Sequence, residues 1–242
     1  MVFHNANKKS ALPVWFWLQM LIFLAVLACS SEEKIEPQPQ ENSGGFTFFD
    51  VHHDTIYTKS LRERLVGTLS SDAIEYRSII NLEIVEEGFL QQHFPRLDEL
   101  NRRLNYPAGE RVEHPTIKLM YRWATRKNLP FSYVELLFSQ ESRKPLYVKI
   151  ESARNIDDIV DSLSEKYGPS TVLQLDSGRG EIRYWENNRD VFLVARLLRR
   201  SRRPLYRMMI YYADNLEEFI LGQEKLREMI EEKQQREGRS AF

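Results

Sequence analysis

The chain has 242 residues, of which 42% are apolar and 29% are charged, and its formal net charge is -1. This composition is typical of a folded protein and excludes disorder of the whole chain. The near-neutral charge argues against a dedicated nucleic-acid-binding protein, and the single cysteine excludes an intrachain disulfide or a cysteine-rich metal site.

The first segment of the chain has the pattern of a secretory signal peptide. A short basic start containing Lys8 and Lys9 precedes a nearly continuous apolar run from Ala11 to Ala28. A basic start, an apolar middle and a small residue at the end are the three parts of such a signal. The length of the run is also at the lower limit for a membrane-spanning helix, so an uncleaved signal anchor is the alternative.

The apolar run ends in Val26-Leu27-Ala28-Cys29, which resembles the lipobox of bacterial lipoproteins. The resemblance implies that Cys29 receives a diacylglyceryl group, that cleavage follows Ala28 and that the new amino terminus is acylated. Leu27 departs from the pattern, which more often has Ala or Ser there. In this family an Asp directly after the cysteine tends to retain the protein in the inner membrane. Ser30 occupies that position here, so the resemblance favours the outer membrane, facing the periplasm, over the inner membrane. Two or more acyl chains hold a protein stably on a bilayer.

We divide the chain into five segments. Residues 1–28 are the signal peptide, and residues 29–45 are the lipidated cysteine and a tether too polar to form a core. Residues 46–130 are expected to be helix-rich, 131–223 to form an α+β sheet domain, and 224–242 to form a charged C-terminal helix. The predicted fold class is α+β, with an antiparallel sheet and one covering helix.

Helical spacing dominates the expectations for residues 46–130. Residues 60–65 predict a short helix, and leucines at helical spacing predict another over 95–105. His114-Pro115 predicts the start of a third helix, because proline is favoured at the first helical position. Residues 74–85 are compatible with either a strand or a helix.

Strand patterns dominate the C-terminal half. The candidate strands are residues 131–138, 146–150, 172–175, 182–185, 191–198 and 205–212. Connections of hairpin length join the first two strands to each other and the last four to one another, which implies antiparallel neighbours. An apolar stripe between Ile156 and Tyr167 predicts the covering helix. Asp214 and Glu217 form a start resembling a capping box for the final helix.

An arginine cluster surrounds the predicted connection between residues 191–198 and 205–212. Its members are Arg196, Arg199, Arg200, Arg202, Arg203 and Arg207. Because guanidinium groups bind phosphates in a bidentate way, these arginines are candidates for contact with an anionic envelope surface. The alternative is a solvated loop whose charge is balanced by acidic residues elsewhere.

The sequence contains no linear motif of an active site. His52-His53-Asp54 is the one close cluster of metal-ligand types, but neighbouring strand residues point to opposite faces and no further ligand spacing accompanies them. We therefore expect no metal and no cofactor. Gly178-Arg179-Gly180 predicts a hairpin tip, and Asp157-Asp158 fits the first turn of a helix, where negative charge is favoured.

These observations favour a membrane-tethered lipoprotein of the cell envelope that acts as a non-catalytic binding or structural module. Its expected partners are the membrane, through the N-terminal lipid, and an envelope protein, an anionic lipid or a wall polymer. No nucleic acid is expected. The alternative is a periplasmic hydrolase acting on wall or lipid components, because many active sites have no linear signature.

Overall fold

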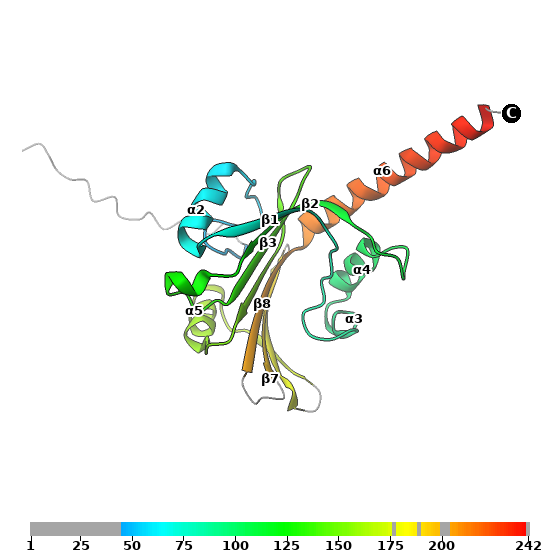
Figure 1. The fold of residues 1–242 in the computed structure, drawn as a ribbon. Coiled ribbons are helices and arrows are strands. Elements are labelled where there is room, and N and C mark those ends of the chain that lie inside the picture. Colours follow the sequence, from blue (N-terminus) through cyan, green and yellow to red (C-terminus); the bar gives the residue numbers. More distant parts are fainter. Residues whose placement is uncertain (1–44, 176–177, 188–189, 199–203, 241–242) are drawn as a thin grey trace, which may run out of the picture. The chain divides into compact units, whose positions relative to one another are not determined.

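The computed structural model describes residues 45–175, 178–187, 190–198 and 204–240 (Figure 1). Residues Gly44–Phe242 form one compact unit, which is the unit described below. The predicted lipobox with Cys29 lies outside the described residues. Four of the six arginines of the predicted cluster also lie outside them, namely Arg199, Arg200, Arg202 and Arg203.

The described elements are, in chain order, α2 (Lys59–Leu69), β1 (Asp72–Ser78), α3 (Phe89–His93), α4 (Pro95–Leu104), β2 (His114–Tyr121), the 3₁₀ helix η1 (Ala124–Lys127), β3 (Tyr133–Ser139), β4 (Pro145–Ser152), α5 (Asp157–Tyr167), β5 (Thr171–Gln174), β6 (Gly180–Glu186), β7 (Asp190–Leu198), β8 (Pro204–Tyr212) and α6 (Ala213–Ser240). The strands form one eight-stranded sheet in the order β1-β2-β3-β4-β8-β7-β6-β5. Every neighbouring pair is antiparallel. The α+β class is therefore confirmed.

One expectation for the N-terminal half is wrong, because His114–Tyr121 is strand β2 and not the start of a helix. Its alternate residues Ile117 and Leu119 point into a buried cluster, as the two-residue period of a strand requires. The ambiguous segment 74–85 contains the larger part of β1 and then an irregular stretch. The sheet thus extends into the region that was expected to be helix-rich.

The expected strands and covering helix of the C-terminal half agree with the structure. The expected capping box is wrong, because α6 already begins at Ala213 and the Asp214 and Glu217 carboxylates accept hydrogen bonds from Arg96. The two strands β3 and β4 pair across the predicted turn, and β6, β7 and β8 follow as antiparallel neighbours. Helix α5 begins beside Asn155, whose Oδ1 accepts a hydrogen bond from the Asp157 N–H at 2.9 Å. It ends at Gly168, whose φ of 87° is a left-handed value that favours glycine.

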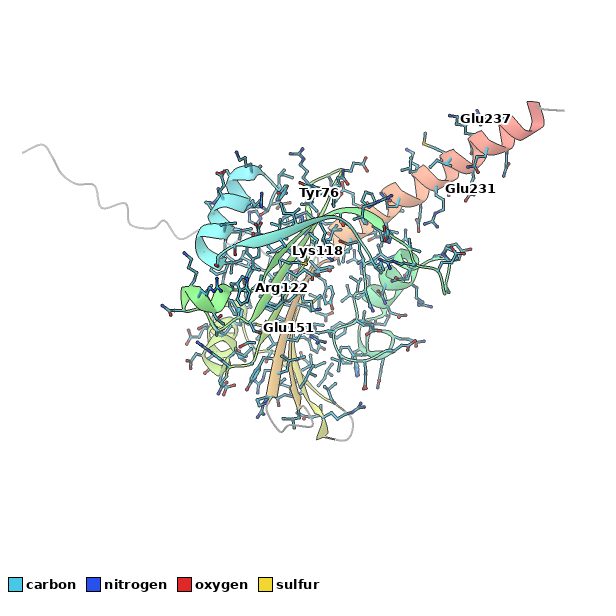
Figure 2. The ribbon with its side chains drawn as sticks, viewed as in Figure 1. Tyr76, Lys118, Arg122, Glu151, Glu231 and Glu237 are labelled. Carbon is cyan, nitrogen blue, oxygen red and sulfur yellow. The ribbon has the colours of Figure 1, made fainter. Side chains whose placement is uncertain are left out.

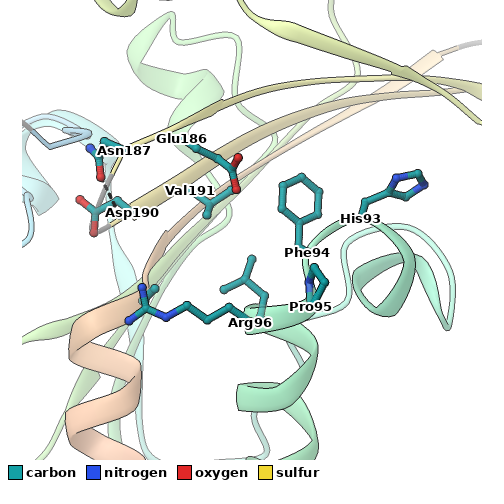
Figure 3. A pocket seen from close by; sticks show the side chains of 10 residues that line it. His93, Phe94, Pro95, Arg96, Glu186, Asn187, Asp190 and Val191 are labelled. Carbon is teal, nitrogen blue, oxygen red and sulfur yellow. Dashed lines mark hydrogen bonds between the residues drawn. The ribbon is translucent and has the colours of Figure 1, made fainter.

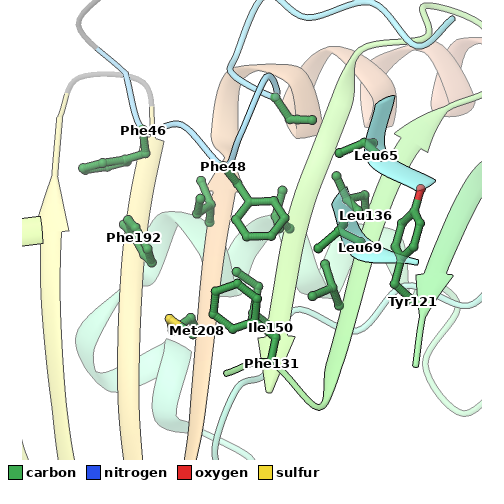
Figure 4. Packing of buried hydrophobic residues seen from close by; sticks show 14 of the residues in the cluster. Phe46, Phe48, Leu65, Leu69, Tyr121, Phe131, Leu136, Ile150, Phe192 and Met208 are labelled. Atoms are coloured by element: carbon green, nitrogen blue, oxygen red, sulfur yellow. The ribbon is translucent and has the colours of Figure 1, made fainter. Parts of the chain in front are cut away.

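Helical and irregular segments cover both faces of the sheet. Helices α2 and α5 lie on one side, and α3 and α4 lie on the other (Figure 1). On the first face, Phe46 and Phe48 of the segment before α2 pack with Leu136 and Met208 of the central strands (Figure 4). A fully buried side chain of this size contributes about 1.5–3 kcal/mol. The segment that begins at Phe46 is therefore part of the core.

Helix α6 starts in the core and then leaves it. Leu216, Phe219 and Ile220 are buried, whereas Leu226 and Met229 are exposed. Beyond the core the helix extends away from the sheet (Figure 1). Within the described part of the chain, no helix combines the length and the apolar character needed to cross a membrane.

Candidate functional site

The two described arginines of the predicted cluster point to opposite faces of the sheet. Arg196 is opposite Tyr206 in the register of β7 and β8, and Arg207 is opposite Ala195. Arg207 Nε donates to Glu151 Oε1 at 3.1 Å, and its Nη1 donates to the Ile84 carbonyl at 2.5 Å. Arg196 is exposed and forms no ion pair with a described residue. Of these two described arginines, Arg196 is therefore the one available to an external anion.

Arg196 lines the first candidate site, a groove of about 410 Å³ between α5 and strands β6, β7 and β8. The side chains that line this groove include Asp157, Val160, Asp161, Arg183, Arg196 and Tyr206. The cluster of apolar residues beneath them includes Val160 and Tyr206, so the floor of the groove is continuous with the core. We call this site the α5 groove.

The α5 groove carries charges of both signs. Arg183 Nε lies 3.2 Å from Glu181 Oε1, and Asp157 Oδ2 accepts a hydrogen bond from Asn155 Nδ2 at 2.7 Å. Asp161 and Arg196 have no such partner among the described residues. The groove therefore offers one free carboxylate and one free guanidinium to a ligand that carries both charges.

A second and smaller pocket, of about 150 Å³, lies between the start of α4 and the β6–β7 turn (Figure 3). Phe94 and Val191 form its apolar wall, with Glu186 at its edge (Figure 3). Arg96 also lines it, but its Nη2 donates to Asp214 Oδ1 at 2.7 Å and to Glu217 Oε2 at 2.9 Å. Ligand pockets usually measure about 300–1,000 Å³, so this pocket is small for a ligand site.

The two adjacent histidines have separate partners. His53 Nδ1 lies 3.1 Å from Asp190 Oδ1, and His52 Nδ1 accepts a hydrogen bond from the Asp54 N–H at 3.3 Å. Burial raises the pKa of Asp190, and its hydrogen bond with His53 opposes that shift. The described residues contain no group of three or more His, Cys, Asp or Glu side chains placed to hold a metal ion. The His53–Asp190 contact joins the segment before α2 to the start of β7.

The structure also brings together a polar surface that the sequence reasoning missed. It lies on the side of strands β2, β3 and β4 opposite α2 and α5, and it consists of Lys118, Arg122, Tyr133, Glu135, Lys149 and Glu151. We call it the polar face. The labels of Lys118, Arg122 and Glu151 follow one another down the sheet in Figure 2. The sequence signal that could have revealed this surface is the alternation of polar and buried residues in β3 and β4.

Glu135 occupies the centre of the polar face. Its Oε2 accepts a short hydrogen bond from the Tyr133 hydroxyl, and its Oε1 accepts one from the Tyr147 hydroxyl at 2.5 Å. Burial raises the pKa of both tyrosines, and the neighbouring Glu135 raises each further. Both phenols therefore remain protonated donors at neutral pH, and they occupy both oxygens of Glu135.

The fold places this protein in the α+β class, with an open antiparallel sheet that is covered on both faces. No protein family model matches the chain, and neither a curated protein nor a solved structure is similar to it. The two surface sites, the α5 groove and the polar face, are therefore the basis for any functional assignment.

Proposed function

We propose that this protein is a lipid-anchored protein of the cell envelope that binds a segment of another envelope protein in the α5 groove, without catalysis. The anchor depends on the lipobox resemblance of Val26-Leu27-Ala28-Cys29. The binding role depends on one observation, the free Asp161 and Arg196 side chains that line a groove of about 410 Å³.

The chemistry of the groove favours a polypeptide ligand. Its volume lies within the usual range of about 300–1,000 Å³ for ligand sites. A polypeptide segment carries basic and acidic side chains along one chain, so it can satisfy Asp161 and Arg196 together. Complementary charges at the rim of an interface give specificity and faster association. Val160 and Tyr206 supply apolar contact area below the charged rim.

The test is site-specific photo-crosslinking of the full-length protein in its native membrane. A photoreactive residue at position 157, which lines the groove and leaves Asp161 and Arg196 in place, is expected to give one discrete adduct with an envelope protein. The same residue at position 63, on exposed α2, is the control position and is expected to give none.

A charge reversal then links the adduct to the groove. Arg196→Glu is expected to reduce the adduct from position 157 by about fivefold or more, because a lost interfacial ion pair costs about 1 kcal/mol or more. Arg236→Glu, on the exposed part of α6, makes the same change of charge and is expected to leave the adduct intact. Equal adducts from positions 157 and 63, or no effect of Arg196→Glu, would refute the proposal.

A further inference from the structure

We infer that the turn around η1 is a membrane-contact site, which docks the protein onto a bilayer surface that carries anionic lipids. The inference rests on the anchor of the proposed function, because that anchor keeps a bilayer close to the protein. The site uses Trp123, Arg126 and Lys127, which belong neither to the α5 groove nor to the polar face. We call these three residues the η1 patch.

The η1 patch presents an indole ring to the solvent. Trp123 is 49% exposed, whereas Trp185, the other tryptophan of the described residues, is 4% exposed and donates to the Gly168 carbonyl. Ala124, directly after Trp123, is fully buried in the core, so the turn is fixed to the body. Tryptophan combines an apolar ring system with a polar N–H, and it concentrates at the interface between lipid and water. An exposed tryptophan on a fixed turn is therefore suited to a bilayer surface.

Two cations accompany the indole ring. The guanidinium carbon of Arg126 lies 4.4 Å from the centroid of the Trp123 ring, in a cation–π contact that holds the two side chains together. A guanidinium stacked on an aromatic ring still presents its N–H groups to phosphate. Lys127 is exposed, and neither Arg126 nor Lys127 forms an ion pair within the described part of the chain. Both charges are therefore available to lipid headgroups.

The segment around η1 carries positive charge without a carboxylate. From residue 121 to residue 132 the sequence contains Arg122, Arg126 and Lys127 but no acidic residue. Helix α2 packs against η1, and its last four residues, 66–69, are uncharged. The positive charge of the turn is therefore not cancelled by the turn itself or by the end of the helix beside it.

The carboxylates of strands β1 to β4 are each matched by a cation. The pairs are Asp72 with Arg62, Glu75 with Lys118, Glu151 with Arg207 and, directly opposite each other in the sheet, Glu135 with Lys149. Beyond β4 the chain adds the exposed Arg154, and the first turn of α5 adds Asp157 and Asp158. Arg154 and the three cations of the turn thus outnumber these two carboxylates. The excess is positive and favours anionic over neutral lipid.

The η1 patch is also accessible to a flat surface. η1 is the short bright-green helix beside α2 at the left of Figure 1, and α6 projects from the body on the opposite side. A bilayer can therefore approach η1 without meeting the projecting half of α6.

The anchor allows a weak site of this kind to act. An anchored protein stays within the length of the predicted tether, residues 29–45, from the bilayer, so docking of the patch is an event within one assembly. An anionic bilayer attracts each nearby Lys or Arg about fivefold more strongly than a neutral one. Two cations and one indole ring are therefore sufficient to orient the tethered protein.

The first experiment follows the fluorescence of Trp123 in the full-length protein reconstituted into vesicles. The vesicles contain phosphatidylcholine with or without phosphatidylglycerol, and their acyl chains are brominated or unmodified, because bromine quenches a tryptophan that reaches the bilayer. Subtracting the signal of Trp123→Phe removes the contribution of every other tryptophan, including Trp15 and Trp17 of the predicted signal peptide. Brominated chains are expected to quench the difference signal only when phosphatidylglycerol is present.

The second experiment removes one charge of the patch. Lys127→Gln leaves the contact between Trp123 and Arg126 in place, and it is expected to lower the ratio of quenched to unquenched Trp123 about fivefold. Lys233→Gln makes the same change of charge at a 77% exposed position of α6 and is the matched control. The control is expected to leave the ratio unchanged.

The outcomes separate a membrane-contact site from general electrostatic attraction. Quenching that requires phosphatidylglycerol and is weakened by Lys127→Gln alone supports the inference. No quenching in anionic vesicles, equal quenching in neutral vesicles, or equal effects of the two lysine variants would overturn it.

Failure of the proposed anchor gives a different result. The mass of the N-terminal peptide reports lipidation at Cys29, independently of Trp123. A chain that keeps its apolar run as a signal anchor also holds the η1 patch near a bilayer, so the fluorescence test remains valid without lipidation. Absence of quenching in a lipidated chain refutes the η1 patch alone. Neither result depends on crosslinking from the α5 groove.

Discussion

His114 is a buried histidine whose protonation is coupled to folding. Its Nε2–H donates to the Leu104 carbonyl at 2.8 Å, and its ring packs edge-on against Phe219 with centroids 5.7 Å apart. Burial lowers its pKa below 6.5, the Leu104 hydrogen bond opposes this shift, and the positive charge of Arg227 adds to it. The folded protein therefore binds a proton at this site less readily than the unfolded chain does.

This difference predicts a loss of stability at acidic pH. A histidine with a lowered folded pKa contributes full stability above 6.5, and that contribution falls as the pH drops from 6.5 toward the folded pKa. His114→Phe is expected to lower the free energy of unfolding at pH 8 by about 1–3 kcal/mol, because the Leu104 carbonyl loses its donor. The variant should lose less further stability than the wild type between pH 7 and pH 5, as measured by urea denaturation. An identical pH dependence of both proteins would contradict this role.

The pairing of β6 with β7 depends on a glycine at the first residue of β6. Gly180 has a φ of 147° and lies opposite Leu197 in the register of the two strands. A Cβ atom placed on Gly180 would lie 1.9 Å from the Arg196 carbonyl oxygen, which is a severe backbone clash. No rotamer change can relieve it, so the strand end itself would have to move. Arg196 of the α5 groove would move with it.

Gly180→Ala is therefore expected to lower the free energy of unfolding by about 2 kcal/mol or more. It should also reduce crosslinking from the α5 groove. Gly67→Ala is the matched control, because a Cβ there meets nothing within 4 Å and the residue lies in helix α2. The control is expected to be neutral or to stabilise the protein by up to about 1 kcal/mol. Similar effects of the two variants in chemical denaturation would contradict the clash.

The elements differ in how far the sequence determines them. Helix α5 and the β3–β4 hairpin were predictable because an apolar stripe and a short polar turn are local signals. Strand β2 was not, because Pro115 fits the first turn of a helix and the apolar residues that follow fit both periods. Only the pairing of β2 with β1 and β3 selects the strand.

The candidate sites depended on contacts that sequence spacing does not contain. Arg196 and Arg207 are close in the chain, but strand alternation and pairing send them to opposite faces. The polar face joins side chains from β2, β3 and β4, and the partners of Glu135 become visible only in the folded sheet. The α5 groove needs both a helix and strands that are distant in sequence. Local patterns therefore identified Arg196 of the α5 groove as a candidate, but not the groove itself, and they identified no residue of the polar face as a site residue.

At the scale of the whole molecule, the predicted lipidation of Cys29 determines the expected location of the protein at the membrane. Cys29 is the sole cysteine of the chain and directly follows the apolar run. Cys29→Ser is expected to block lipidation and cleavage, so the variant keeps the larger precursor mass and incorporates no labelled fatty acid. Mass spectrometry of the wild-type N-terminal peptide is the decisive measurement. A peptide that begins at Met1, or a free thiol at Cys29, would replace the lipoprotein assignment with the signal anchor.

The strand order has a consequence for the sequence of events during synthesis. Strand β8 is the last of the described strands to leave the ribosome, yet it pairs with both β4 and β7 in the middle of the sheet. Until it arrives, β1–β4 and β5–β7 are two separate partial sheets, and each has an unpaired apolar strand edge. Such edges readily pair with other chains. The nascent chain is therefore most prone to aggregation just before β8 emerges, and loss of β8 would leave it permanently in that state.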